Sequence, residues 1–180
     1  MLGAIDRAGV PYMLTGSIAA SYYGAPRGTQ DIDVVVAPTG DQLRALVAIL
    51  AVNEYYVDED AALEAQRHRG QFNVIDLATG WKVDVIMRKE RPFSQEEFDR
   101  RTRADFEGLQ LTIATIEDLI IAKLEWARLG QSQRQIDDIA RLLEVREGSL
   151  DRAYLARWVQ QLGLQEQWTA ACRKAERPTG

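Results

Sequence analysis

The spacing of hydrophobic positions predicts strands in the first part of the chain and helices in the last part. Short runs rich in apolar or β-branched residues predict strands at 11–15, 31–37, 55–57, 72–77, 81–87 and 109–113. Apolar residues at helical spacing predict helices at 18–22, 43–50, 59–68, 94–101, 115–130 and 132–143, then a helical pair that begins at 151 and breaks near 163.

This order predicts an α+β fold in two parts. A mixed β-sheet flanked by helices is expected over residues 1–114, and a C-terminal helical bundle, residues 115–180, is expected to pack on it. The runs at 72–77 and 81–87 are separated by three residues that end in Gly80, which predicts a β-hairpin. Ser94 and Thr115 each precede an acidic residue by three positions and are predicted helix N-caps.

Composition narrows the class of protein. The 180 residues, 46% of them hydrophobic, suffice for one globular core. Cys172 is the single cysteine, which excludes an internal disulfide. No secretory segment and no run of about 18 apolar residues occurs, so we expect a cytoplasmic protein without membrane contact. The net charge of −5 argues against a surface that binds nucleic acid throughout.

Acidic residues mark the start of the strand at 31–37. Residues two apart in a strand project to the same face, so Asp31 and Asp33 present paired carboxylates. In the second arm of the hairpin, Asp84 shares a face with Lys82, and an adjacent pairing would bring Asp84 beside the pair. Asp76 on the other arm is the competing third carboxylate.

Such a cluster requires a compensating cation. At about 5 Å and an effective dielectric near 20, each pair of carboxylates repels by about 3 kcal/mol. Oxygen ligands suit Mg²⁺ or Mn²⁺, and the sequence has no Cys/His set for zinc. We therefore predict Asp31, Asp33 and Asp84 as catalytic residues and metal ligands. The alternative for Asp31 and Asp33 is a solvated strand face.

A glycine and a serine stand at a predicted helix start upstream of the carboxylates. Free backbone N–H groups there attract phosphate, and Gly16 permits close approach while Ser17 adds a donor. The alternative is an ordinary turn. Together the two features predict nucleotidyl transfer, with Asp84 as base or metal ligand for the acceptor hydroxyl.

These residues resemble a known pattern. Thr15-Gly16-Ser17 followed by Arg27-Gly28-Thr29-Gln30-Asp31-Ile32-Asp33 is similar to the signature of the polymerase β-like nucleotidyltransferase superfamily. The form is especially similar to the branch with abortive-infection nucleotidyltransferase toxins and small uncharacterised bacterial proteins. The resemblance implies a nucleotidyltransferase-type sheet and a nucleoside triphosphate as substrate.

The later stretch from Glu117 to Trp126, with Asp138, looks like helical motifs of that branch. The resemblance implies that Lys123 lies near the nucleotide phosphates and that Asp138 supports it, with Arg27 and Thr29 also on the phosphate side. The alternative for Lys123 is a surface lysine whose stem packs on the helix.

Other features leave alternatives open. The basic residues at 88–91 and 100–103 fit an RNA end or a phosphorylated acceptor, or a solvated face, which we prefer. We expect the tryptophans at 126, 158 and 168 to pack the helical tail. The acceptor stays open between protein, RNA and a small molecule. The rival function is a non-catalytic nucleotide-binding or toxin–antitoxin-type module.

Overall fold

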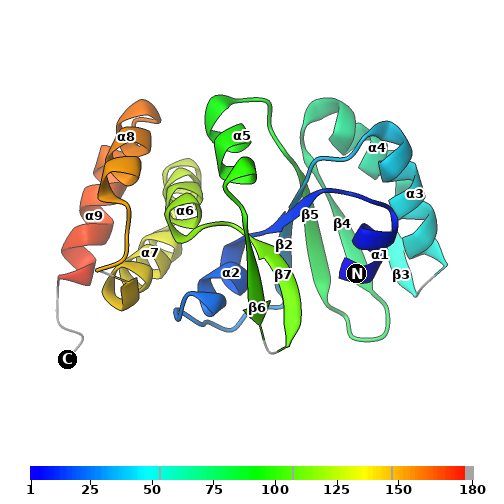
Figure 1. Ribbon diagram of the computed structural model, residues 1–180, viewed down its shortest axis with the longest axis horizontal. Coiled ribbons are helices and arrows are strands. Elements are labelled where there is room, and N and C mark those ends of the chain that lie inside the picture. Colours follow the sequence, from blue (N-terminus) through cyan, green and yellow to red (C-terminus); the bar gives the residue numbers. More distant parts are fainter. Residues whose placement is uncertain (53, 107, 147, 177–180) are drawn as a thin grey trace.

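The computed structural model describes residues 1–52, 54–106, 108–146 and 148–176, which form a central sheet with helices on both faces (Figure 1). The strands are β1 (Tyr12–Leu14), β2 (Asp31–Val36), β3 (Tyr55–Val57), β4 (Gln71–Asp76), β5 (Lys82–Met87), β6 (Thr102–Phe106) and β7 (Leu109–Ile113). The helices are α1 (Leu2–Arg7), α2 (Gly16–Tyr22), α3 (Gly40–Ala51), α4 (Glu59–His68), α5 (Pro92–Asp99), α6 (Ile116–Gly130), α7 (Gln133–Arg146), α8 (Arg152–Gln161) and α9 (Gln165–Ala175).

The described strands form one mixed sheet in the order β3-β4-β5-β2-β1-β7-β6. The central pair, β2 and β5, runs parallel, and β1 pairs antiparallel with β2 and parallel with β7. The hairpin of β4 and β5 is antiparallel, as the sequence predicts. The adjacency of β2 and β5 fixes the geometry of the carboxylates.

The two faces of the sheet bury separate hydrophobic cores. One core joins Val34 and Val83 to α1, α3 and α4. The other joins Met13 and Val35 to α2, α5 and the C-terminal helices. Asp31 and Asp33 alternate with the residues of the first core and therefore lie on the face that looks toward the C-terminal helices.

The C-terminal helices pack around α6, which is mostly buried and contacts α2, α7, α8 and α9. Gly163 lies between α8 and α9 with φ +66°, the left-handed conformation that favours glycine at the end of a helix. Within the described part of the chain, no helix has the length and apolar character needed to cross a membrane.

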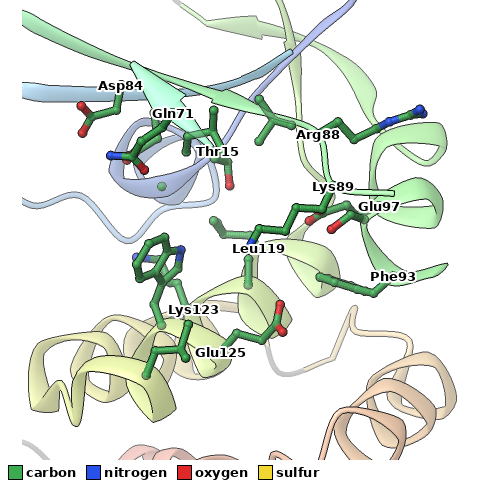
Figure 2. Close-up of a pocket in the computed structure, with 18 of the residues that line it drawn as sticks. Thr15, Gln71, Asp84, Arg88, Lys89, Phe93, Glu97, Leu119, Lys123 and Glu125 are labelled. Atoms are coloured by element: carbon green, nitrogen blue, oxygen red, sulfur yellow. The ribbon is translucent and has the colours of Figure 1, made fainter. Parts of the chain in front are cut away.

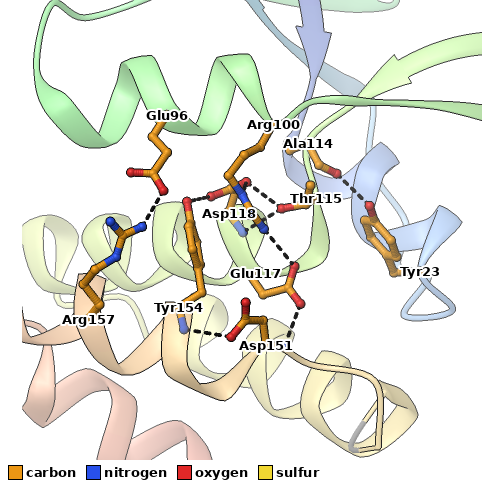
Figure 3. A network of polar contacts seen from close by, with 10 residues as sticks. All are labelled: Tyr23, Glu96, Arg100, Ala114, Thr115, Glu117, Asp118, Asp151, Tyr154 and Arg157. Carbon is orange, nitrogen blue, oxygen red and sulfur yellow. Dashed lines mark hydrogen bonds and ion pairs between the residues drawn. The ribbon is translucent and has the colours of Figure 1, made fainter.

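A buried polar network fixes α6 to the segments before and after it (Figure 3). Asp118 in the first turn of α6 is fully buried, and its carboxylate accepts hydrogen bonds from Arg100 at 3.1 Å, from the Thr115 hydroxyl at 2.5 Å and from the Tyr154 hydroxyl. Arg100 follows α5 and Tyr154 belongs to α8. A buried carboxylate with three donors stabilises this arrangement of α5, α6 and α8.

Several elements differ from the sequence prediction. Helix α1 and strand β6 were not predicted, and β6 forms a hairpin with the predicted β7. Ser94 is not the N-cap of α5: the helix begins at Pro92, because the fixed φ of proline suits the first helical turn, and Ser94 is buried inside it. The Thr115 cap is confirmed, since its side chain accepts from Asp118 N–H. The predicted division at 114/115 falls between β7 and α6.

We expect Asp118→Ala to lower the free energy of unfolding by about 3 kcal/mol, because it leaves the Tyr154 hydroxyl without its acceptor and the Arg100 guanidinium with only the more distant Glu117. The matched control is Asp137→Ala, which removes a more exposed pair with Lys174 and should cost about 1 kcal/mol or less. Urea unfolding of both variants measures the difference. Equal losses would contradict the structural role of the network.

Candidate active site

The parallel register of β2 and β5 places the predicted carboxylates side by side. Asp33 is the direct partner of Asp84, and Asp31 is the direct partner of Lys82. Asp76, the competing candidate, instead accepts hydrogen bonds from the Ala78 and Thr79 N–H groups, both at 3.0 Å, and caps the hairpin turn. The geometry therefore favours Asp84 as the third carboxylate.

Gly16 lies directly against Asp33. Its φ is +62°, and a Cβ atom at this position would lie 1.9 Å from Asp33 Oδ2. Both the backbone conformation and the space therefore require glycine. Helix α2 begins at Gly16 itself, two residues before the predicted start, and Ser17 is buried.

Lys82 supplies a positive charge between the carboxylates. Its Nζ lies 3.4 Å from Asp31 Oδ1 and 3.2 Å from Asp84 Oδ2, and the hydrogen bond to Asp84 raises the pKa of the ammonium. Sequence reasoning placed Lys82 on this face but did not recognise it as a counter-charge. Among the described residues, no group of three His, Cys, Asp or Glu side chains is arranged to hold one metal ion.

Two observations nevertheless fit an added cation. Asp84 Oδ1 is buried without a hydrogen-bond partner, which is costly for a carboxylate. Burial, and next the charge of Asp84, raises the pKa of Asp33 above its ordinary 3.8, while Lys123 opposes the shift. A cation would satisfy the orphaned oxygen and offset the repulsion. Because the pKa of Asp33 is raised, protons would compete with the cation for this carboxylate at a higher pH than they would at an ordinary aspartate.

Lys123 is buried, so the alternative of a surface lysine is wrong. Its Nζ donates to Asp138 Oδ2 at 2.7 Å and to Gln135 Oε1 at 3.3 Å, and Asp138 Oδ2 also accepts from Arg27 Nε at 3.0 Å. Burial lowers the pKa of Lys123, and Asp138 opposes this shift. Asp138 thus holds two cationic side chains near Asp33.

A cavity of about 520 Å³ opens in front of these groups (Figure 2). The predicted site residues that line it are Gly16, Ser17, Arg27, Asp33, Asp84 and Lys123. Those that do not line it are Thr29, Asp31 and Asp138. Thr29 Oγ1 accepts from Asp31 N–H at 3.1 Å, so its observed contact positions the start of β2.

The cavity continues beyond Asp84 to residues that were not among the predicted site residues, including the basic residues at 88–91, for which a solvated face was preferred. Lys89, Glu97 and Trp126 are among its lining residues. Trp126 does not pack the helical tail: its side of α6 faces this cavity, and the residue is 54% exposed. Trp126 comes three residues after Lys123 on the same helix, so the two side chains lie on one face, and this spacing could have predicted that Trp126 belongs to the site.

By sequence, no protein-family model and no curated protein matches the chain. The solution structure of the antibiotic-resistance factor ANT(2'')-Ia matches with a TM-score of 0.58 and 17% identity, over 94% of this chain and 89% of that chain. The chain has the nucleotidyltransferase fold. The expected nucleotidyltransferase-type sheet followed by helices is therefore confirmed.

Two further structures share the nucleotidyltransferase fold. ANT(2'')-Ia in complex with adenylyl-2''-tobramycin gives a TM-score of 0.53 at 16% identity, over 96% of this chain and 91% of that chain. The lincomycin-bound lincosamide antibiotic adenylyltransferase LnuA gives 0.54 at 10% identity, over 80% of this chain and 92% of that chain. At these identities the likeness establishes the fold and not the role of any residue.

We expect Gly16→Ala to weaken binding of a nucleoside triphosphate with Mg²⁺ by about tenfold or more, because the new methyl group would displace the Asp33 carboxylate. Gly80→Ala is the matched control: Gly80 also has a positive φ, +75°, but no atom lies within 4 Å of its added Cβ. Calorimetric titration measures both affinities. Equal losses in the two variants would show that backbone strain alone is responsible.

We expect Lys82→Gln to tighten Mn²⁺ binding about fivefold, because it removes a competing charge worth about 1 kcal/mol or less at this partly exposed position. Arg44→Gln removes one positive charge from an exposed pair with Asp41 and should leave the affinity unchanged. Paramagnetic resonance of free Mn²⁺ measures the dissociation constants. Weaker binding in Lys82→Gln would contradict a competition between ammonium and metal.

Proposed function

We propose that the protein is a metal-dependent nucleotidyltransferase that transfers a nucleoside monophosphate from a nucleoside triphosphate to a hydroxyl group. The observation that carries the proposal is that Asp33 pairs with Asp84 and also lies against Gly16, with all three residues on the wall of one cavity. The fold supports it, because ANT(2'')-Ia has been seen with adenylyl-2''-tobramycin and LnuA is an adenylyltransferase.

Asp31, Asp33 and Asp84 would hold Mg²⁺ or Mn²⁺, since all their donor atoms are oxygens. The bound metal would neutralise charge on the phosphates and lower the pKa of the attacking hydroxyl. Asp31 and Asp84 must release Lys82 to take this role.

The triphosphate is proposed to lie on the side of Gly16 and Ser17, with Arg27 and Lys123 offsetting its charge. In this structure a single oxygen of Asp138, Oδ2, accepts hydrogen bonds from both Arg27 and Lys123, which keeps these two side chains close to Asp33. Thr29 supports this side indirectly through the backbone of Asp31. Phosphate oxygens would offer Arg27 and Lys123 further acceptors.

The reaction exchanges one phosphorus–oxygen bond for another and transfers one proton. The acceptor oxygen attacks the α-phosphorus, the bond from that phosphorus to the oxygen bridging to the β-phosphorus breaks, and pyrophosphate leaves. Asp84 accepts the proton of the hydroxyl as the new phosphodiester forms. Positioning and electrostatic stabilisation supply the rate enhancement in such a transfer.

One observation favours a second candidate, a nucleotide-binding or toxin–antitoxin-type module without turnover. Lys82 already pairs with both Asp31 and Asp84 and offsets part of their charge, as a site that binds nucleotide without metal would need. Pyrophosphate release separates the candidates: the enzyme releases it when an acceptor is supplied, whereas the module binds nucleotide and releases none across a panel of protein, RNA and small-molecule acceptors.

We expect the double variant Asp31→Asn, Asp33→Asn to lose Mg²⁺-dependent binding of each labelled nucleoside triphosphate by about a hundredfold, because two of the three carboxylates lose their charge. Asp76→Asn, which changes the turn-capping carboxylate, is the control and should bind as the wild type does. Filter binding with and without Mg²⁺ provides the measurement. Unchanged binding in the double variant would rule out the proposed function.

A further inference from the structure

The cavity has a second half that the proposed transfer does not yet use. Ile86 on β5 and Arg88 directly after the strand both line the cavity with Asp84, so the cavity wall continues beyond Asp84 toward α5. Its apolar lining there includes Phe93 and Leu119, both buried. Because Asp84 stands where this half begins, a molecule bound in it would present its hydroxyl to the Asp84 carboxylate.

The acidic groups in this half are already neutralised. Glu125 accepts two hydrogen bonds from the guanidinium of Arg91, so this pair carries no net charge. Glu97 is buried, and burial followed by the charge of Asp118 raises the pKa of Glu97 to about 8. Arg91 lowers this pKa and Glu125 raises it further. At pH 7 Glu97 is therefore largely protonated and uncharged.

Two basic residues, Lys89 and Arg88, in contrast have no carboxylate partner among the residues that the structure describes. Lys89 lines the cavity, and Figure 2 shows its side chain extending from the end of β5 into the space between Glu97 and Leu119. Within the described part of the chain, neither Lys89 nor Arg88 forms an ion pair. The Arg88 guanidinium lies 5.5 Å from the centre of the Phe98 ring, and its Nε is buried without a hydrogen-bond partner.

The resulting balance of charge is positive. Lys89 contributes one positive charge inside the cavity and Arg88 adds another at its edge, over the Phe98 ring, whereas the Arg91–Glu125 pair and the protonated Glu97 contribute none. A polycationic acceptor would therefore be repelled, and an anionic group would find an unpaired ammonium at the open end of an apolar pocket.

We propose that this half of the cavity binds a small acceptor molecule through a phosphate monoester, which pairs with Lys89 while the acceptor hydroxyl faces Asp84. The inference rests on the proposed nucleotidyl transfer and specifies its acceptor as a phosphorylated polyol or sugar. The volume of about 520 Å³ for the whole cavity suits a small molecule rather than a folded macromolecule. Lys89 acts as a specificity residue that binds the acceptor and takes no part in the transfer chemistry.

The test uses molecules that share a skeleton and differ in charge. The full chain is first saturated with Mg²⁺ and a non-hydrolysable nucleoside triphosphate, and is then titrated calorimetrically with glucose, glucose 6-phosphate and glucosamine, and with ribose and ribose 5-phosphate. We expect at least one phosphorylated sugar to bind about tenfold or more tightly than its neutral parent, and glucosamine to bind no better than glucose. No preference in either pair, or a preference for glucosamine, would overturn the proposal.

Lys89→Gln should abolish that preference, and Lys89→Arg should retain most of it, because it keeps the charge. Lys174→Gln is the matched control: it makes the same substitution at a lysine that pairs with Asp137 on α7, outside the cavity lining. A phosphorylated sugar that binds Lys89→Gln as tightly as the wild type would overturn the assignment of Lys89.

The first titration, with nucleotide alone, separates this inference from the proposed function. If the triphosphate does not bind, the nucleotidyltransferase assignment fails. The sugars are then titrated onto the free protein, and a preference for phosphorylated sugars that Lys89→Gln abolishes would still support the binding site at Lys89. If the triphosphate binds and Lys89→Gln weakens it instead of the phosphorylated sugar, Lys89 belongs to the nucleotide and the acceptor proposal is overturned.

Discussion

The parallel pairing of β2 with β5 is the constraint on which the site depends. It sets Asp33 directly beside Asp84 and turns both toward the C-terminal helices. The opposite residues of both strands are buried aliphatic side chains under α3 and α4, so a slip by one residue would move the carboxylates into the core. The hydrophobic core therefore holds the carboxylates in place despite their repulsion.

The charges around this pair are balanced by lysines from two directions. Lys82 reaches Asp31 and Asp84 from the strand itself, and Lys123 reaches toward Asp33 from α6, held by Asp138. A metal ion would replace the Lys82 ammonium beside Asp31 and Asp84, and phosphate oxygens would give the Lys123 ammonium a further acceptor. The site is therefore arranged for an exchange of ionic partners in which the backbone need not move.

Much of this arrangement was predictable from local patterns. Alternation along the strand assigned Asp31 and Asp33 to one face, and the short turn before Trp81 predicted the hairpin that carries Asp84. Long-range features were less accessible. The burial of Lys123 and the exposure of Trp126 depend on how α6 packs, and β6 carries too little hydrophobic alternation to reveal itself without its partner β7. Lys82 was visible in the sequence, but only the register of β2 and β5 shows that it bridges two aspartates.

The most direct test of the account is a crystal structure of the protein with Mn²⁺ and a non-hydrolysable nucleoside triphosphate, in which anomalous scattering locates the metal. We predict a metal peak bound by Asp33 and at least one of Asp31 and Asp84, with Lys82 withdrawn and phosphate oxygens beside Gly16 and Lys123. A metal bound elsewhere, with Lys82 still between Asp31 and Asp84 in the presence of bound nucleotide, would contradict the account.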